Sequence, residues 1–159
     1  MTSDLFTKLI LRAARRMSIT KLEDLAMMMA MAEQESFHGG NPTMLAVNYH
    51  NLFGFKWSPT DSARYEKIDF PPNKFEVGMG RTDWVSYRCY DSFEHCIENW
   101  NWHRVMSTHY KAAFDQWRAT GDYRGWIRAI GLVWDDTNPH HADQLVQRYD
   151  RWIDKLSEG

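Results

Sequence analysis

The sequence predicts a mostly α-helical α+β domain in which a small β lobe interrupts a run of helices. Apolar residues recur at helical spacing before residue 57 and after residue 90. Between Trp57 and Tyr90, short alternating stretches are separated by proline and glycine. The chain has 159 residues, the length of one domain, and neither a repeat nor a long linker divides it. We therefore expect a single domain over residues 1–159.

Capping and helix-breaking residues set the limits of the predicted helices. Ser3 can cap a first helix that runs to about Met17, and the capping box Thr20-Lys21-Leu22-Glu23 begins a second helix that extends to Ser36. Residues 27–31 of the second helix are apolar on every face, which predicts that this helix is central and buried. The segment His38-Gly39-Gly40-Asn41-Pro42 stops it. Further helices are expected at 44–48 after the cap Thr43, from 91 or 92 to 106, and at 107–119, 122–133 and 140–156, with breaks at Gly121 and Asn138-Pro139.

The predicted β lobe covers about residues 60–90. Apolar and polar residues roughly alternate in Tyr65–Phe70 and in Trp84–Tyr90, the pattern of a half-buried strand. The breaks are Pro59, Pro71, Pro72, Gly78 and Gly80. This pattern favours a β-hairpin or a three-stranded lobe inserted between helices.

Composition argues against several classes of partner. A net charge of −2 gives no global basic field, so nucleic acid is not an expected partner. Arg12, Arg15 and Arg16 make the end of the first helix basic, which indicates a solvated helix face rather than contact with an anionic surface. No apolar run approaches the roughly 18 residues of a membrane span, so no stable membrane insertion is expected.

The sequence also lacks the usual signs of a metal or a cofactor. Cys89 and Cys96 are seven residues apart and belong to no Cys-x-x-Cys, so they predict neither a disulfide framework nor a zinc site. There is no His-Glu-x-x-His, and the adjacent His140 and His141 point in different directions on a helix. We expect neither a metal nor a cofactor.

Two carboxylates near the end of the second helix, Glu33 and Glu35, are candidates for acid catalysis. The negative end of the helix dipole and the apolar methionines nearby both disfavour the charged form of a carboxyl group there. A carboxylic acid that keeps its proton near neutral pH is what the cleavage of a glycosidic bond requires. These arguments from the residues do not separate Glu33 from Glu35.

A resemblance to a known family separates them. The segment concerned reads Glu35-Ser36-x(7)-Met44-Leu45-Ala46-x(4)-Asn51-Leu52-Phe53-Gly54-Phe55-Lys56. It resembles glycoside hydrolase family 73, the endo-β-N-acetylglucosaminidases and the flagellar-rod peptidoglycan hydrolase domain. Two later blocks also resemble that family: Ser86-Tyr87-Arg88-Cys89-Tyr90-Asp91-Ser92 and Gly131-Leu132-x-Trp134-x-Asp136-x-Asn138-Pro139-x-His141-Ala142-x(2)-Leu145. The three blocks follow the family's order from about Thr20 to Ile153. The resemblance implies a lysozyme-like helical domain.

The resemblance implies that Glu35 is the acid catalyst. The family's second carboxylate stands in the β lobe shortly before the Arg88 block, and Glu76 fits that place best, with Glu66 and Asp69 as alternatives. The sequence does not fix the distance between the two carboxyl groups, and so it predicts neither retention nor inversion. The chain departs from the family in the loop 37–43 and at His141 and Trp134.

Six residues are candidate sugar contacts. Eight Trp, seven Tyr and eight Phe supply aromatic faces both for a core and for a groove that binds sugars. The six candidates are Asn51, Phe53, Lys56, Trp57, Trp84 and Tyr90. Asn51 can instead satisfy backbone groups of its turn, and each of the aromatic residues can instead belong to the core.

The function expected from the resemblance is hydrolysis of the β-1,4 bond after N-acetylglucosamine in bacterial peptidoglycan. The nearest alternative is a lysozyme-like muramidase or lytic transglycosylase that cuts the N-acetylmuramic acid linkage. A non-catalytic wall-binding or virion assembly module is an alternative of another class. No signal peptide is visible at residues 1–4. We therefore expect a monomeric phage endolysin that is made in the host cytoplasm and acts on the cell wall after release.

Overall fold

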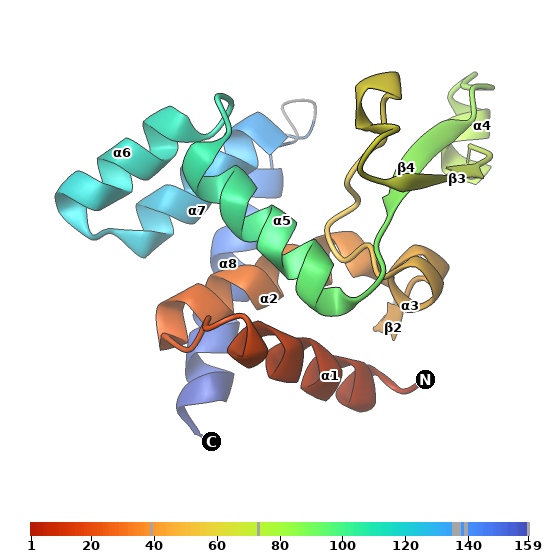
Figure 1. Ribbon diagram of the computed structural model, residues 1–159. Helices are drawn as coiled ribbons and strands as arrows, with labels where there is room; N and C mark the ends of the chain where they lie inside the picture. The colour runs from red at the N-terminus through yellow and green to blue at the C-terminus, as the bar shows by residue number, and fades with distance from the viewer. Residues whose placement is uncertain (39, 73, 135–137, 139, 159) are drawn as a thin grey trace.

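The computed structural model describes residues 1–158 except 39, 73, 135–137 and 139. The helices are α1 (Ser3–Arg16), α2 (Leu22–Ser36), α3 (Met44–Tyr49), α4 (Lys74–Gly78), α5 (Phe93–Met106), α6 (Lys111–Thr120), α7 (Tyr123–Trp134) and α8 (His141–Ser157), with a 3-10 turn at Pro59–Asp61. The strands are β1 (Phe37–His38), β2 (Asn41–Pro42), β3 (Glu66–Phe70) and β4 (Val85–Cys89). The predicted fold class, a mostly helical domain with a small inserted β lobe, is confirmed (Figure 1).

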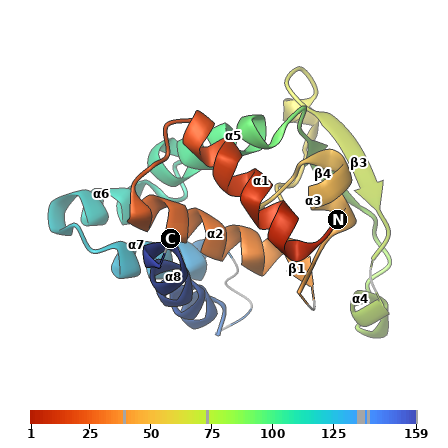
Figure 2. The same ribbon diagram turned by 90° about the horizontal axis from the view of Figure 1, so that it is seen from below.

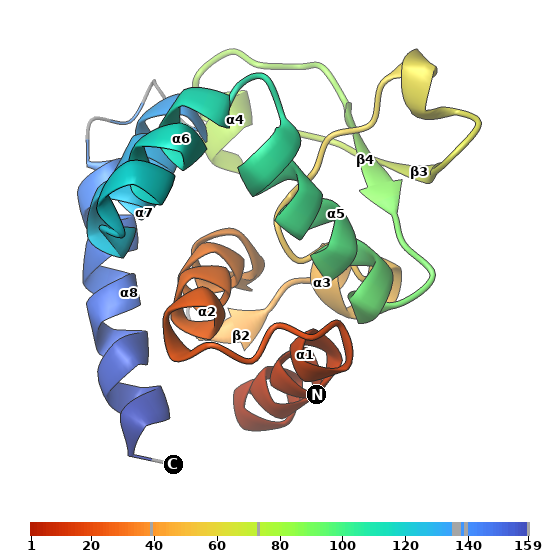
Figure 3. The ribbon, with the colours of Figure 1, turned by 60° about the vertical axis from the view of Figure 1, so that its left-hand side comes forward.

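The methionine-rich helix α2 is the centre of the helical body, as its sequence predicts. Every residue from Leu25 to Ala32 is buried. Helix α8 packs along α2, and α7 packs along α8; Figure 3 shows α2 between α8 on one side and α1 and α5 on the other. Methionine fills irregular space well because its side chain is unbranched and flexible. The stretch of α2 that has no polar face is therefore covered by other helices on all sides.

The β lobe is an antiparallel pair with a short helix at its tip. Strands β3 and β4 pair with Ile68 opposite Tyr87. Helix α4 lies in the connection between them and projects away from the helical body (Figure 2). On the other edge of β4, Trp57 N donates to Ser86 O at 2.9 Å and Arg88 N donates to Phe55 O at 3.0 Å. The hairpin prediction is therefore confirmed, and a single bridge from Lys56 to Tyr87 is all that forms of a third strand among the described residues.

Two helix starts differ from the prediction because the preceding turn has a tertiary role. Helix α2 begins at Leu22 and its N-cap Lys21 makes no side-chain capping bond, so the predicted capping box at Thr20 is wrong. The turn after α1 places Ile19 in the core and leaves Thr20 exposed. Helix α6 begins at Lys111 rather than at Ser107, because Ser107 is buried and extended.

The other predicted ends agree with the structure to within one residue or two, although Thr2 rather than the predicted Ser3 caps α1, by accepting from Leu5 N at 3.2 Å. Thr43 Oγ1 caps α3 by accepting from Ala46 N at 3.3 Å, and Ser92 caps α5. Gly121 ends α6 with a φ of +71°, a conformation that glycine adopts without strain. Of the predicted breaks, Gly39 and Pro139 lie outside the described residues.

Both cysteines are free thiols. Cys96 is fully buried in the core, and burial raises the pKa of its thiol to about 12. In the described part of the chain, no helix is both long and apolar enough to cross a membrane. Within the same residues, no three His, Cys, Asp or Glu side chains are grouped so that they could hold a metal ion.

Candidate active site

Glu35 lies at the end of α2, half-buried, against the loop that follows α3. The closest approach is at Gly54, where a Cβ atom would stand 3.3 Å from Glu35 Oε2. Gly54 has a φ of +66°, a region that side chains other than glycine rarely adopt. Glycine is therefore required twice at this position, by the backbone conformation and by the carboxylate beside it.

Buried hydrogen bonds join the two parts of the first sequence block. Ser36 Oγ donates to the carbonyl of Leu52, and Thr43 N donates to Ser36 O at 2.8 Å. The Glu35-Ser36 pair and the Asn51–Lys56 segment are thus in contact in the fold. They are separated in the sequence because the chain forms α3 before it returns to the end of α2.

The structure separates Glu33 from Glu35, which the residues alone do not. Glu33 accepts hydrogen bonds from Arg148 and Arg151 and, at 3.2 Å, from Trp152 Nε1, all three on α8. Its side chain is only 14% exposed. Glu33 therefore belongs to the α2–α8 interface, whereas Glu35 lies on the side of the β lobe.

A groove of about 460 Å³ lies beside Glu35. Gly54 and Tyr110 line it, and Glu35 acts electrostatically on Tyr110. Burial, and next the charge of Glu35, raise the pKa of Tyr110 to about 12. Its hydroxyl group therefore keeps its proton near neutral pH and can donate a hydrogen bond. The other residues lining the groove are Phe55, Lys56, Arg88, His103, Ser107, His109 and Trp134.

Stacked aromatic rings form one wall of this groove. The Phe55 and His103 rings stack with centroids 5.0 Å apart, and the Tyr110 and Trp134 rings with centroids 6.0 Å apart. Flat apolar faces of this kind suit the apolar faces of sugar rings. Tyr110 and His103 are absent from the sequence-predicted site because no motif contains them; His103 reaches the groove from α5, and Tyr110 from the turn between α5 and α6.

Glu76 lies on α4 in the β lobe and its side chain is 27% exposed. Arg81 Nη1 is 3.8 Å from Glu76 Oε2. Burial first, and then the charges of Glu76 and Glu35, raise the pKa of Tyr87 on β4. Both predicted carboxylates thus act electrostatically on the hydroxyl group of Tyr87.

The alternatives to Glu76 are placed differently. Asp69 accepts hydrogen bonds from Ser86 Oγ and from Lys67 Nζ at 3.1 Å, and these two bonds lower the pKa of its carboxyl group. Asp69 points to the opposite face of the sheet from Tyr87, because side chains alternate along a strand and Ile68 is the partner of Tyr87. Glu66 is exposed and stands opposite Cys89.

Three of the six candidate sugar contacts are interior residues. Asn51 is 1% exposed: its Nδ2 donates to the carbonyls of Phe55 and Arg88, both at 2.9 Å, and its Oδ1 accepts from Phe55 N at 3.0 Å. Phe53 is fully buried and stacks on Trp100, with ring centroids 5.5 Å apart. Tyr90 is 4% exposed and its hydroxyl donates to Asn99. These are the turn and core roles that the sequence left open, and they correct the prediction of direct sugar contact.

The other three candidates have exposed surface. Lys56 is exposed and lines the groove. Trp57 is half-buried and its Nε1 donates to Tyr65 O at 3.0 Å, which fixes the ring against the β lobe. Trp84 is 65% exposed just before β4. Of these three, Lys56 is the one that lies in the groove beside Glu35.

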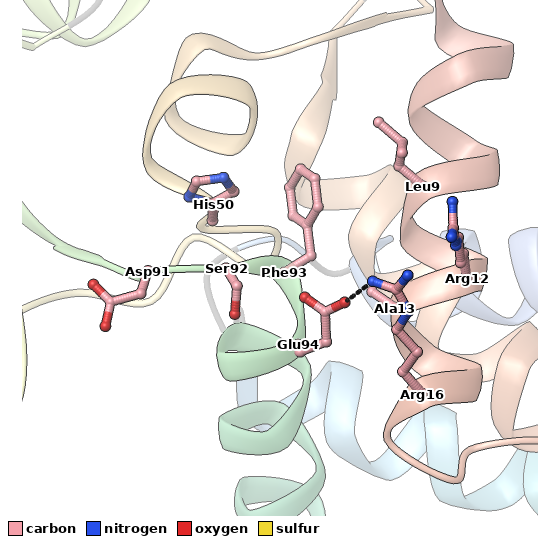
Figure 4. Close-up of a pocket in the computed structure, with 9 residues that line it drawn as sticks. All are labelled: Leu9, Arg12, Ala13, Arg16, His50, Asp91, Ser92, Phe93 and Glu94. Atoms are coloured by element: carbon pink, nitrogen blue, oxygen red, sulfur yellow. Dashed lines mark hydrogen bonds and ion pairs between the residues drawn. The ribbon is translucent and has the colours of Figure 1, made fainter.

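A second hollow, of about 250 Å³, lies between α1 and the start of α5 (Figure 4). It is lined in part by Arg12 and Arg16, and Arg16 Nη1 pairs with Glu94 Oε1 at 3.3 Å. Arg12, Arg15 and Arg16 are all exposed, as expected of a solvated helix face. None of the predicted catalytic or sugar-contact residues lines this hollow.

Substitution of Gly54 by alanine should impair the site as well as the fold. The positive φ costs roughly 1–2 kcal/mol of stability for a residue with a Cβ. The new methyl group would also displace the Glu35 carboxylate, so we expect a fall in any catalysis by Glu35, measured on purified cell wall, the substrate that the sequence resemblance implies. Gly121→Ala is the matched control: it has a φ of +71° and open space around its Cβ position, so it should lose similar stability and no activity. Equal activity in both variants would contradict this prediction.

His103 should make the fold less stable in mild acid. Burial, and next the charge of Arg88, lower the pKa of His103 from 6.5 to about 4. Between these values the unfolded chain binds a proton that the folded chain does not, so stability should fall as pH decreases from 6.5 to 4 and level off below. Urea midpoints at pH 7 and pH 4.5 measure this loss. It should shrink in His103→Asn and persist in a variant of the exposed His109; an unchanged loss in His103→Asn would refute the assignment.

No known family profile and no curated protein sequence matches this chain. Among solved structures, the glycoside hydrolase domain of Salmonella typhimurium FlgJ is similar with a TM-score of 0.63 and 18% identity, over 99% of this chain and 92% of that one. A C-terminally truncated form of the same domain gives a TM-score of 0.61 and 18% identity, over 99% of both chains. The chain has a lysozyme-like glycoside hydrolase fold. At this identity the likeness concerns the fold, and the chemistry has to be argued from the site.

Proposed function

We propose that the chain is a monomeric peptidoglycan hydrolase that cleaves the β-1,4 bond after N-acetylglucosamine, with Glu35 as its acid. The observation that carries the proposal is the placement of Glu35 at the end of α2, against Gly54 and beside an aromatic-walled groove. The resemblance of three sequence blocks to glycoside hydrolase family 73 and the similarity of the fold to a glycoside hydrolase domain support it.

The reaction assigns one task to each carboxyl group. Glu35 donates its proton to the glycosidic oxygen as the bond from that oxygen to C1 breaks, and positive charge develops at C1 and the ring oxygen. Glu76 either accepts a proton from the attacking water or stabilises this charge as a carboxylate. Water supplies the hydroxyl group at C1 and its remaining proton returns to the carboxyl pair, so the products are one new reducing end and one new non-reducing end, and no cofactor is consumed.

The groove supplies the contacts that hold the sugar. Stacking on Tyr110, Trp134 and Phe55 would orient a ring without competing for the acid proton. The protonated Tyr110 hydroxyl and the exposed Lys56 ammonium are donors for acetamido and hydroxyl oxygens. Lys56 thereby retains the sugar-contact role predicted from the sequence, and Trp84, exposed before β4, stays a predicted sugar contact outside the groove.

Mass spectrometry of digested peptidoglycan tests the linkage. Reducing-end N-acetylglucosamine is the expected product. Reducing-end N-acetylmuramic acid would indicate a muramidase, and an anhydro product would indicate a lytic transglycosylase; either would overturn the assignment. Wall binding without any cleavage products would instead favour a wall-binding or assembly module.

We propose a phage lysis system as the biological setting, in which the enzyme is made in the host cytoplasm and reaches the wall through a membrane lesion. Production of the protein in the bacterial cytoplasm tests this. Cells should keep growing until a lesion-forming protein is co-produced, and should then lyse. Lysis without the lesion, or survival with it, would refute the proposed setting.

A further inference from the structure

A hollow of about 420 Å³ lies between α5 and the segment that leads into β3. Arg88 and His103 line both this hollow and the groove beside Glu35. The two cavities are therefore neighbours that share this pair of side chains. A branched ligand with one arm in the groove would have its other arm close to the hollow.

The wall between the two cavities is held in place. Arg88 Nη2 pairs with Asp61 Oδ1 at 3.2 Å, and Arg88 Nη1 donates to Asn99 Oδ1 at 2.8 Å. The Arg88 guanidinium also lies 4.7 Å from the centre of the Tyr65 ring. These partners occupy Arg88, so the charge that a ligand meets in the hollow has to come from other residues.

Arg64 and Glu98 supply that charge, with opposite signs and from opposite walls. Both line the hollow and both are exposed. Within the described part of the chain, neither side chain forms an ion pair or a side-chain hydrogen bond. Trp102, one helical turn after Glu98 on α5, lines the same hollow and is 54% exposed. The hollow thus presents a cation, an anion and an aromatic face together.

We infer that this charged hollow binds the peptide stem of peptidoglycan while the glycan occupies the groove beside Glu35. The inference rests on the proposed function. In a stem-bearing strand the lactyl carboxyl group of N-acetylmuramic acid is an amide, so the sugars are uncharged and a further sugar would leave Arg64 and Glu98 without ionic partners. A stem peptide carries both carboxylate and ammonium groups and branches from the glycan, which matches both the charges and the position of the hollow. Its volume lies within the ~300–1,000 Å³ typical of small-ligand sites.

Two glycan substrates test the assignment: strands that carry their peptide stems, and the same strands after an amidase has removed the stems and the lactyl carboxyl groups so exposed have been amidated to keep the sugars uncharged. Arg64→Ala and Glu98→Ala should each lower kcat/KM on stem-bearing strands roughly tenfold, as expected for one lost charge-assisted contact. Neither should change kcat/KM on stem-free strands. Arg118→Ala and Asp154→Ala, which remove exposed charges far along α6 and α8, are the matched controls and should change neither value.

The possible outcomes are distinct. Equal losses on both substrates would show that the hollow binds sugar, and no loss on either would show that it binds nothing; both results overturn the inference while leaving hydrolysis intact. A wild-type protein that cleaves neither substrate would instead refute the proposed function. Both substituted side chains are exposed, so melting temperatures should match the wild type and confirm that each variant is folded.

Discussion

Glu35→Gln should reduce wall hydrolysis by roughly 10²- to 10⁴-fold, the usual contribution of a positioned general acid. The amide has nearly the shape of the acid but cannot give a proton to the glycosidic oxygen. Because Glu35 lies at the edge of a groove rather than in the core, the variant should fold and melt close to the wild-type temperature. Turbidity loss of purified peptidoglycan, followed at equal concentrations of folded protein, measures the effect.

Glu33→Gln is the matched control, two residues away on the same helix. Glu33 holds α8 through Arg148, Arg151 and Trp152, so its variant should lose about 1–3 kcal/mol of stability and keep its activity per folded molecule. Glu35→Gln should therefore lose activity and keep its stability, whereas Glu33→Gln should lose stability and keep its activity. An active Glu35→Gln together with an inactive, well-folded Glu33→Gln would exchange the roles of the two carboxylates.

Arg104→Ala should destabilise the fold by about 3–5 kcal/mol, the cost of breaking a buried ion pair by removing one partner. Arg104 Nη1 lies 2.8 Å from Asp24 Oδ1, with the arginine side chain 8% exposed. Its guanidinium is also close to two indole rings, 4.4 Å from the centre of Trp100 and 4.9 Å from that of Trp126. Removal would leave Asp24 half-buried without its cation and open a gap between α2, α5 and α7. Urea unfolding measures the change.

Arg16→Ala is the control for Arg104→Ala. Arg16 also pairs with a carboxylate, Glu94, but its side chain is 58% exposed, and exposed pairs contribute about 0–1 kcal/mol. A double substitution of Asp24 and Arg104 by uncharged residues should cost less than the sum of the single changes, because no unpaired charge remains. Additive losses would show that the two side chains are not coupled.

The sequence predicts well those features that depend on neighbouring residues. The absence of a polar face in residues 27–31 is enough to place α2 at the centre, since such a helix has no side that favours water. Thr43 is recognised as a cap because a short hydroxyl side chain before a helix satisfies a free backbone amide. The strand pair is recognised from alternation alone.

Features that depend on distant residues were not predictable in the same way. Thr20 has the right neighbours for a cap, but the burial of Ile19 decides where α2 starts. Glu33 and Glu35 have equivalent local surroundings, and in the fold they differ by their tertiary neighbours, α8 for Glu33 and Gly54 for Glu35. The aromatic wall joins Phe55, Tyr110 and Trp134 from three separate segments, so no window of sequence contains it. Local patterns indicate that α2 carries the candidate acid Glu35, and tertiary contacts determine what surrounds its carboxyl group.

The hydrogen bonds of Asn51 bear on how this enzyme could change over evolution. One side-chain amide binds the backbone at Phe55, where the chain leaves for the β lobe, and at Arg88, where it returns. Asn51 thus holds the two ends of the insertion together by hydrogen bonds, and these bonds do not involve the residues between them. Residues 57–86 can then vary in length and sequence while the helical body and Glu35 remain in place, as long as a carboxylate is kept at the position of Glu76. Exchange of this segment between proteins of the same fold should transfer the surface of the lobe as a unit.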